Sequence, residues 1–375
     1  MAITIANVKR ICVAVAIAFA FIGSMIVTTA QAAKAPQSTP IPLLLTGVTG
    51  TPLTFAVIAK SADCSSAGCF QLERTTDNGA TFTALHLPPI SSAPGSSAGN
   101  LSQMIFANST DGYASFDVAN SFDWYATTNG AESWQRLSVG PGESIIELVV
   151  THTVLYAVIA RCAKAYTCTN YRMALKSLNG NRWTTESLPK PLSKGKFALS
   201  AYGSNVWINL QGPRSPLLFT SYDAGRTFSE RSASPLASVS ACGVTPMSST
   251  VLWAECPTGM LVSFFSSVDA GEHWTSISRY TFSGTGGGVF DPVSSSLAYL
   301  NFGPYTTQVN DLYAITSSGH TMTAVGNLAC TSTDQLVFSN AAHGLVICQK
   351  NGLLTSTQLL RTSNGGRNWT KVNLS

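Results

Sequence analysis

The stretch TSYDAGRTF, residues 220–228, has a near copy in SSVDAGEHW, residues 266–274. In both stretches an Asp stands two positions after a Ser, a Gly two positions after the Asp, and an aromatic residue three positions after the Gly. This spacing suits either an acidic site or a tight turn, because a short carboxylate can transfer protons or accept hydrogen bonds from nearby backbone N–H groups. The number of copies decides between these two interpretations.

The pattern, here named the repeat turn, occurs seven times along the chain. Some copies carry Asn in place of Asp, and one is a residue short. The copy at Thr316 lacks both the Asp and the aromatic residue. The copies begin at Thr75, Thr127, Ser177, Ser221, Ser267, Thr316 and Thr362. Successive copies therefore start 44 to 52 residues apart. A period of about 48 residues over the whole chain is typical of a propeller or a solenoid.

Each repeat contains four short segments with strand character. In the second repeat, SQMIFA, YASFDV, DWYATT and WQRLSV follow one another and are bounded by Gly, Asn, Asp and Ser. After residue 32 the apolar residues show no convincing helical periodicity over any length. Four-stranded units at this period form blades, and seven blades close a ring. The sequence therefore predicts an all-β protein, a seven-bladed β-propeller of four-stranded antiparallel blades.

The acidic or amide residue of the repeat turn is predicted to be structural. A short side-chain oxygen accepts hydrogen bonds from the backbone beyond it, and Asn serves as well as Asp. The Gly supplies a positive φ, and the aromatic residue starts the outer strand and is buried. A catalytic acid would not be replaced by Asn or repeated in every blade. The predicted turn-forming residues are Asp77, Asn129, Asn179, Asp223, Asp269 and Asn364.

The repeat turn resembles the Asp-box, or BNR, repeat of sialidases, sortilin-type receptors, xyloglucan-active hydrolases and the photosystem II assembly/stability factor. The hairpins FANSTDGYA (106–114) and FSNAAHGLV (338–346) resemble the first hairpin of that last group and of its bacterial relatives. The resemblance covers residues 43–375 and implies a sialidase-like propeller fold. It does not determine function, because one fold hosts unrelated activities.

The N-terminus has the pattern of a secretory signal peptide. Lys9 and Arg10 precede a long apolar run, and Ala30-Gln31-Ala32 follows it, so residues 1–32 are predicted to be removed. Residues 33–42 form a Pro/Ser-rich tether, and 43–375 the propeller. A retained membrane anchor is the alternative. With the signal cleaved, we expect no stable membrane insertion and a secreted, periplasmic or cell-surface location.

The eight cysteines after the leader fall into four local couples. An even count in an exported chain is typical of disulfides, and the spacings lack the paired CxxC or His motifs of zinc sites. Nearest-neighbour pairing predicts the disulfides Cys64–Cys69, Cys162–Cys168, Cys242–Cys256 and Cys330–Cys348.

The charge balance argues against a nucleic-acid partner. The chain has 22 basic and 18 acidic residues, and the loss of two basic residues with the leader leaves a net charge of +2. This value is too small to favour nucleic acid or an anionic membrane surface.

No catalytic constellation is recognisable. Sialidases hold a carboxylate with three arginines, the first in an Arg-Ile-Pro-like motif before the first repeat turn. Here Arg74 lies inside the first repeat, and Arg214 in PRSP precedes the fourth turn, so this role does not transfer. No spacing pairs the loop acids for glycoside hydrolysis. The five histidines lack HxH and HExxH spacing. We therefore expect no catalytic residue, cofactor or metal. The acids outside the repeat turns include Asp63, Asp117, Asp123, Glu255 and Asp311, and their spacing singles out no pair.

A binding surface is predicted on the face opposite the repeat turns. The cysteine couples gather there and would hold loops in place, which lowers the entropic cost of binding. The same face is predicted to carry a patch of cations and one aromatic residue. This possible ligand patch comprises Arg161, Lys164, Tyr166, Lys190, Lys194 and Lys196. A solvated basic rim is the alternative interpretation of the patch.

The leading hypothesis is an exported, non-catalytic propeller that binds a protein or a glycan through its disulfide-stapled face. The first alternative is a glycoside hydrolase whose carboxylates are not paired by spacing. The second, which the family resemblance alone implies, is an assembly or stability factor for a membrane complex.

Overall fold

The structure is a computed structural model in which residues 38–375 form one compact unit. It describes residues 40–48, 51, 54–60, 70–89, 100–118, 121–164, 167–189, 196–211, 217–231, 242–258, 261–277, 282–283, 289–302, 310–316, 321–328, 330–350 and 357–374. Within these ranges the secondary structure consists of strands and turns. The described residues contain no helix that is long and apolar enough to cross a membrane.

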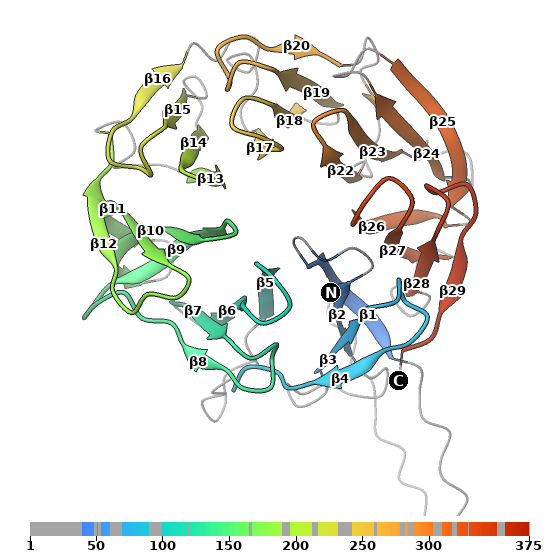
Figure 1. Ribbon diagram of the computed structural model, residues 1–375, viewed down its shortest axis with the longest axis horizontal. Helices are drawn as coiled ribbons and strands as arrows, with labels where there is room; N and C mark the ends of the chain where they lie inside the picture. The colour runs from blue at the N-terminus through green and yellow to red at the C-terminus, as the bar shows by residue number, and fades with distance from the viewer. Residues whose placement is uncertain are drawn as a thin grey trace, which may run out of the picture. The chain divides into compact units, whose positions relative to one another are not determined.

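The described strands form seven antiparallel sheets, which confirms the predicted seven-bladed propeller (Figure 1). The first three blades contain β1 (Ile41–Gly47), β2 (Phe55–Lys60), β3 (Phe70–Thr75) and β4 (Thr83–Leu85); β5 (Asn100–Phe106), β6 (Gly112–Val118), β7 (Ser121–Thr127) and β8 (Gln135–Arg136); and β9 (Ser144–Val150), β10 (Val154–Lys164), β11 (Thr167–Ser177) and β12 (Thr184–Ser187).

The remaining four blades follow the same order of strands. They contain β13 (Lys196–Tyr202), β14 (Asn205–Gln211), β15 (Leu217–Ser221) and β16 (Ser229–Arg231); β17 (Gly243–Pro246), β18 (Leu252–Thr258), β19 (Leu261–Ser267) and β20 (Thr275–Ser276), with β21 (Phe282–Ser283) also paired to β19; β22 (Val289–Ser294), β23 (Leu297–Phe302), β24 (Asn310–Thr316) and β25 (Thr321–Leu328); and β26 (Ser332–Phe338), β27 (Gly344–Gln349), β28 (Thr357–Thr362) and β29 (Thr370–Val372).

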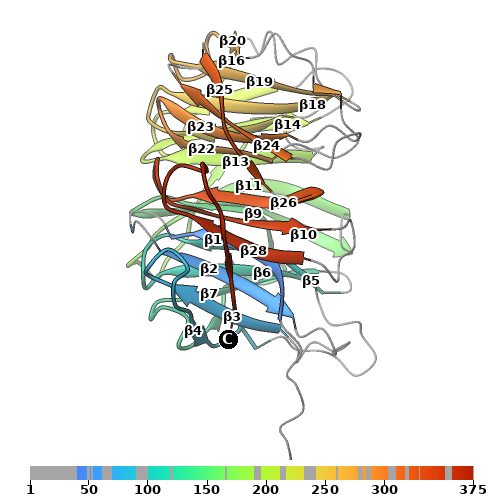
Figure 2. The ribbon, with the colours of Figure 1, turned by 90° about the vertical axis from the view of Figure 1, so that its right-hand side faces the viewer.

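The first strand of each blade lies nearest the centre of the ring, and the fourth lies at its outer edge (Figure 1). The edge-on view in Figure 2 shows that the strands of neighbouring blades are layered face to face. The strand β1 begins at Ile41, two residues before the predicted propeller boundary at residue 43.

The buried hydrophobic residues of the described ranges form seven clusters, one between each pair of neighbouring blades. The second strands explain this division, because successive side chains of a strand point to opposite faces. In β10, Leu155 and Ala157 face blade 2, whereas Tyr156 and Val158 face blade 4. A strand covered on both faces is apolar throughout, as the run VLYAVIA in β10 is.

Side-chain donors also join each blade to the next. The Tyr156 hydroxyl donates to the Gly203 carbonyl over 3.0 Å, and the Tyr299 hydroxyl donates to the Ala341 carbonyl over 2.7 Å. In both cases an aromatic residue near the start of a second strand reaches the first hairpin of the following blade. These bonds fix the rotation of one blade against its neighbour, which hydrophobic contact alone does not specify.

The described residues contain three disulfides: Cys162–Cys168, Cys242–Cys256 and Cys330–Cys348. The first joins directly opposed residues of β10 and β11. The other two join the residue before β17 to β18, and a residue just before β26 to β27. All three lie toward the ends of the blades that point away from the repeat turns. The predicted Cys64–Cys69 pair lies outside the described residues.

Candidate binding surface

The complete repeat turns share one hydrogen-bond network, seen clearly at Asp77. Its carboxylate accepts the backbone N–H groups of Ala80 and Thr81, each over 2.9 Å, and the Thr81 hydroxyl over 2.6 Å. The Thr75 hydroxyl donates to the same carboxylate over 2.7 Å and accepts the Gly79 N–H over 2.8 Å. The hydrogen bonds from Thr81 and Thr75 hold the pKa of Asp77 well below its usual range.

Equivalent contacts surround Asp223 and Asp269 in blades 4 and 5. Hydrogen bonds from Thr227 and Ser221 lower the pKa of Asp223 to about 2. Gly79, Gly225 and Gly271 occupy the same place in the three turns with φ of 76°, 84° and 94°. A side chain would strain the backbone there, so these positions favour glycine.

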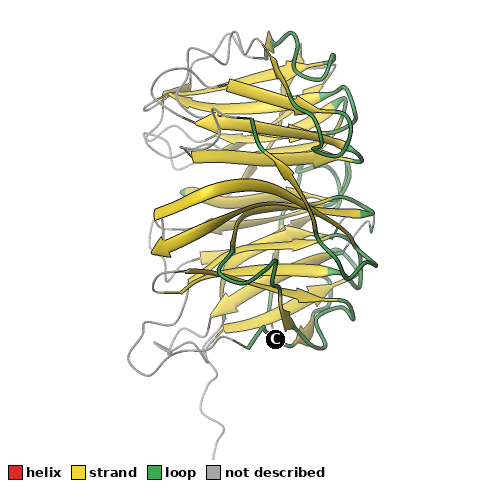
Figure 3. Ribbon diagram, turned by 90° about the vertical axis from the view of Figure 1, so that its left-hand side faces the viewer, coloured by secondary structure: helices red, strands yellow, loops and turns green. Residues whose placement is uncertain are grey.

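The turns with Asn keep the main acceptor contact. Asn129 Oδ1 accepts the Ser133 N–H over 3.0 Å, and Asn364 Oδ1 accepts the Asn368 N–H over 3.0 Å. The shorter turn at Asn179 is closed by a backbone bond from Gly180 to Ser177 over 2.9 Å. All six predicted residues therefore lie in separate blades on one face of the ring, and Figure 3 shows the described turns along one side of the strands.

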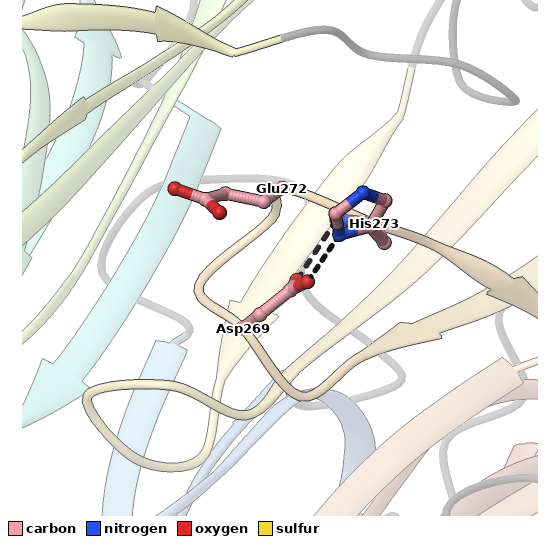
Figure 4. A group of neighbouring side chains, drawn as sticks. All are labelled: Asp269, Glu272 and His273. Carbon is pink, nitrogen blue, oxygen red and sulfur yellow. Dashed lines mark hydrogen bonds and ion pairs between the residues drawn. The ribbon is translucent and has the colours of Figure 1, made fainter.

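One group of three potential metal ligands occurs in the described part of the chain: Asp269, Glu272 and His273, whose ligand atoms lie within 4.8 Å of one another. Asp269 Oδ2 lies 2.6 Å from His273 Nδ1, whereas Glu272 points away from that pair (Figure 4). A carboxylate oxygen of Glu272 instead lies 2.5 Å from an Arg231 nitrogen. Because each carboxylate already has a protein partner, we assign no metal site to this group.

The structure describes the predicted ligand patch only in part. Arg161 is exposed on β10, Lys164 ends β10, and Lys196 begins β13. Tyr166, Lys190 and Lys194 lie outside the described residues. The patch therefore stays a prediction.

A cavity of about 310 Å³ lies between blades 2 and 3 on the face opposite the repeat turns. The link from β8 to β9 covers the beginning of β7 and supplies most of the lining. The lining residues are Asp123, Trp124, Arg136, Leu137, Ser138, Val139, Gly140, Gly142, Glu143, Ser144 and Ile145. No repeat-turn residue is among them.

Two arginine–carboxylate pairs border this cavity. Arg136 Nη2 lies 2.5 Å from Asp123 Oδ1, and Arg172 of β11 pairs with Glu143. The carboxylate side chains are only 10% and 11% exposed, whereas the arginine side chains are 67% and 41% exposed. The nearly buried carboxylates thus hold two guanidinium groups in fixed positions with free donors toward solvent.

Sequence reasoning missed this arrangement. Asp123 was noted as a loop acid without a partner, and neither Arg136 nor Glu143 belongs to any motif. Glu143 and Arg172 are 29 positions apart. Their contact depends on how the link between blades 2 and 3 folds over β11, which no residue spacing indicates.

Three further carboxyl groups lie between blades and not in the cavity. Burial raises the pKa of Glu147 and of Glu255 to about 7. Glu147 is directly opposite Val158 on the side facing blade 4, and Glu255 is opposite Phe264 on the side facing blade 6.

Asp291 occupies the interface of blades 6 and 7. It accepts the Phe338 N–H over 2.5 Å, and burial raises its pKa to about 7 against the effect of that bond. Because Glu147, Glu255 and Asp291 face three different interfaces, they do not form the opposed pair of carboxyls that a glycosidase needs.

No protein-family model matches the chain, and no curated protein matches it in sequence. Solved structures do match its fold. The β-propeller domain of the Trilobed protease from Pyrococcus furiosus has 7% identity and a TM-score of 0.56, over 90% of this chain and 99% of that one. A puromycin-hydrolyzing peptidase from Mycobacterium tuberculosis has 11% identity and a TM-score of 0.59, over 90% of this chain.

The chain spans 53% of that peptidase, about half of its length. YCF48 bound to D1 peptide has 12% identity and a TM-score of 0.49, over 73% of this chain and 82% of that one. At these identities the likeness concerns the fold alone, and the chain is a β-propeller.

Proposed function

We propose that this chain is an exported, non-catalytic propeller of the Asp-box type that binds a protein partner on the face opposite the repeat turns. The observation that carries the proposal is the cavity between blades 2 and 3, with Arg136 and Arg172 held at its border by nearly buried carboxylates. Donors fixed in advance lose little entropy on binding.

Three features support the other parts of the proposal. The shared network at Asp77, Asp223 and Asp269 supports the Asp-box assignment. The leader pattern of residues 1–32 and three disulfides support export to an oxidising environment, whether secreted, periplasmic or at the cell surface.

A protein partner is favoured over a glycan at this cavity. Trp124, the aromatic residue of the lining, is only 3% exposed, and its Nε1 donates to the Ile145 carbonyl. It therefore presents no free ring face for a sugar. A volume of about 310 Å³ is at the lower end of the range for small-molecule pockets and suits one or two partner side chains.

The binding test compares two arginines on opposite faces. The chain is used to capture partners from the extracytoplasmic fraction of its source, as wild type, as Arg136→Gln and as Arg182→Gln. Arg182 is exposed in the repeat turn of blade 3. We expect one partner to be lost with Arg136→Gln and retained with Arg182→Gln. Equal recovery by all three forms would refute the proposed surface.

Glycoside hydrolysis is the second candidate, because Asp123 and Glu143 line one cavity. Each carboxyl, however, accepts a guanidinium donor, which suits a carboxylate and not the proton donor that the reaction requires. We expect no turnover of a panel of fluorogenic glycosides. Turnover that is lost in Asp123→Asn or Glu143→Gln would establish this alternative instead. A role in assembling a membrane complex predicts capture of that complex in the same experiment.

A further inference from the structure

A second candidate surface lies on the repeat-turn face, at the seam between blades 4 and 5. Four large hydrophobic side chains are exposed among the described residues, and three belong to these two blades: Tyr202 (46% exposed), Tyr222 (48%) and Val268 (62%). Leu43, the fourth, lies on β1. Exposed aromatic residues gathered at one place are typical of interaction sites.

Both tyrosines belong to the side of blade 4 that faces blade 5. Tyr202 is directly opposite Asn205, whose side-chain amide donates to the Ser249 carbonyl of blade 5 over 3.0 Å. The Tyr222 hydroxyl accepts Arg231 Nη2 over 3.0 Å. Arg231 in turn pairs with Glu272 of blade 5 over 2.5 Å. The two rings therefore flank a single seam.

At this seam Arg231 is turned toward the protein, whereas Glu272 and Asp269 are turned toward solvent. The Arg231 side chain is 19% exposed, and its Cζ lies 5.5 Å from the centroid of the Tyr222 ring. Glu272 is 48% exposed, and Asp269 is 34% exposed. An approaching partner meets the tyrosine rings, the exposed parts of the Glu272 and Asp269 carboxylates and the His273 side chain, which is 88% exposed, whereas the guanidinium of Arg231 lies behind Glu272.

This arrangement complements a positively charged chain. Tyrosine faces attract Lys and Arg side chains, and carboxylates steer them by charge. We propose that the seam formed by Tyr202, Tyr222 and Glu272 binds a segment rich in Lys or Arg from a protein partner. The site is separate from the cavity between blades 2 and 3, so each can fail without the other.

The test uses fluorescently labelled hexalysine, with hexaglutamate as the opposite charge. Tyr202→Ser and Glu272→Gln should each weaken hexalysine binding about 3-fold or more in fluorescence anisotropy. Tyr202 has no side-chain hydrogen bond in the described structure, so its variant leaves the fold intact. Binding should also weaken as salt rises.

Glu132→Gln is the matched control, because Glu132 is exposed at the position in blade 2 that Glu272 holds in blade 5. This variant and Arg136→Gln should bind hexalysine as the wild type does. Four results would overturn the proposal: no hexalysine binding, equal binding of hexaglutamate, equal losses with Glu132→Gln, or binding of a neutral oligosaccharide that Tyr202→Ser abolishes. The last result would assign the rings to a glycan.

Discussion

The side-chain amide of Asn78 donates to the backbone carbonyl of Thr362 over 2.7 Å, joining residues 284 positions apart. A second bond across the same interface runs from the Leu45 N–H of β1 to Gln335 Oε1 of β26 over 2.5 Å. In the described sheets β1 pairs within the first blade and β29 within the last, so the ring closes without exchange of a strand. Side-chain hydrogen bonds and one hydrophobic cluster therefore stabilise the interface between blades 7 and 1, where the ring closes.

Replacing Asn78 by Ala should weaken this closure without straining the backbone. Ala224 and Ala270 hold the same place in other repeat turns with φ of 62° and 59°, close to the 58° of Asn78. Asn78 Oδ1 is buried without a partner, so its removal offsets part of the loss. We expect the free energy of unfolding to fall by about 1 kcal/mol in urea titrations.

The control for this prediction is Asn181→Ala, which removes an exposed amide from the repeat turn of blade 3. It should leave the free energy of unfolding unchanged. If both variants lost the same stability, the contact to Thr362 would have no special role in closing the ring.

The three disulfides should differ in their resistance to reduction. Cys162 and Cys168 are partly exposed, whereas Cys242, Cys256, Cys330 and Cys348 are 1% exposed or less. Among these six cysteines, a mild reductant followed by thiol labelling of the folded protein should therefore mark only Cys162 and Cys168. Labelling of Cys330 and Cys348 at the same rate would mean that the last blade opens readily.

Removing these bonds should also have unequal effects on stability. The chain-entropy account assigns about 2 kcal/mol to the pair separated by 6 residues and about 3 kcal/mol to the pairs separated by 14 and 18. Paired Cys→Ser variants, compared by urea unfolding, check this order.

The fold could be predicted from the sequence because its determinants are local. The repeat-turn chemistry at Asp77 or Asp223 involves only residues from two positions before the Asp to four positions after it, and strand patterns such as YASFDV are short. Ile41 and Pro42 belong to β1, although their sequence resembles the Pro/Ser-rich tether predicted for residues 33–42. Their place in β1 comes from pairing with β2.

The cavity could not be predicted in the same way. Arg136 meets Asp123 because β8 pairs with β7, and Glu143 meets Arg172 because the blade link folds over a different strand. Neither contact leaves a spacing that differs from that of ordinary surface charges. The seam of Tyr202 and Tyr222 could not be predicted for the same reason, because it depends on two blades lying side by side.

The repeat-turn residues should tolerate amide but not aliphatic replacement. Asp77→Asn keeps the oxygen that accepts the Ala80 and Thr81 N–H groups, as Asn129 does for Ser133. Asp77→Ala removes that acceptor, and we expect it to lower Tm by about 2–4 °C. The check is differential scanning calorimetry of both variants. Equal losses would mean that the charge itself matters more than the acceptor geometry.

Burial of Glu255 should make the protein less stable as pH rises from 5 to 8. Its pKa is raised from 4.5 to about 7 in the folded chain, so over this window the folded state holds a proton that the unfolded state has lost. This contribution is complete below pH of about 4.5 and is lost above about 7. In urea titrations the free energy of unfolding of Glu255→Gln should fall less between pH 5 and 8 than that of the wild type, by up to about 3 kcal/mol. At pH 8 this variant should be more stable than the wild type. The exposed Glu132→Gln should follow the wild-type curve. An unchanged decline in Glu255→Gln would show that the carboxyl is ionised within the fold.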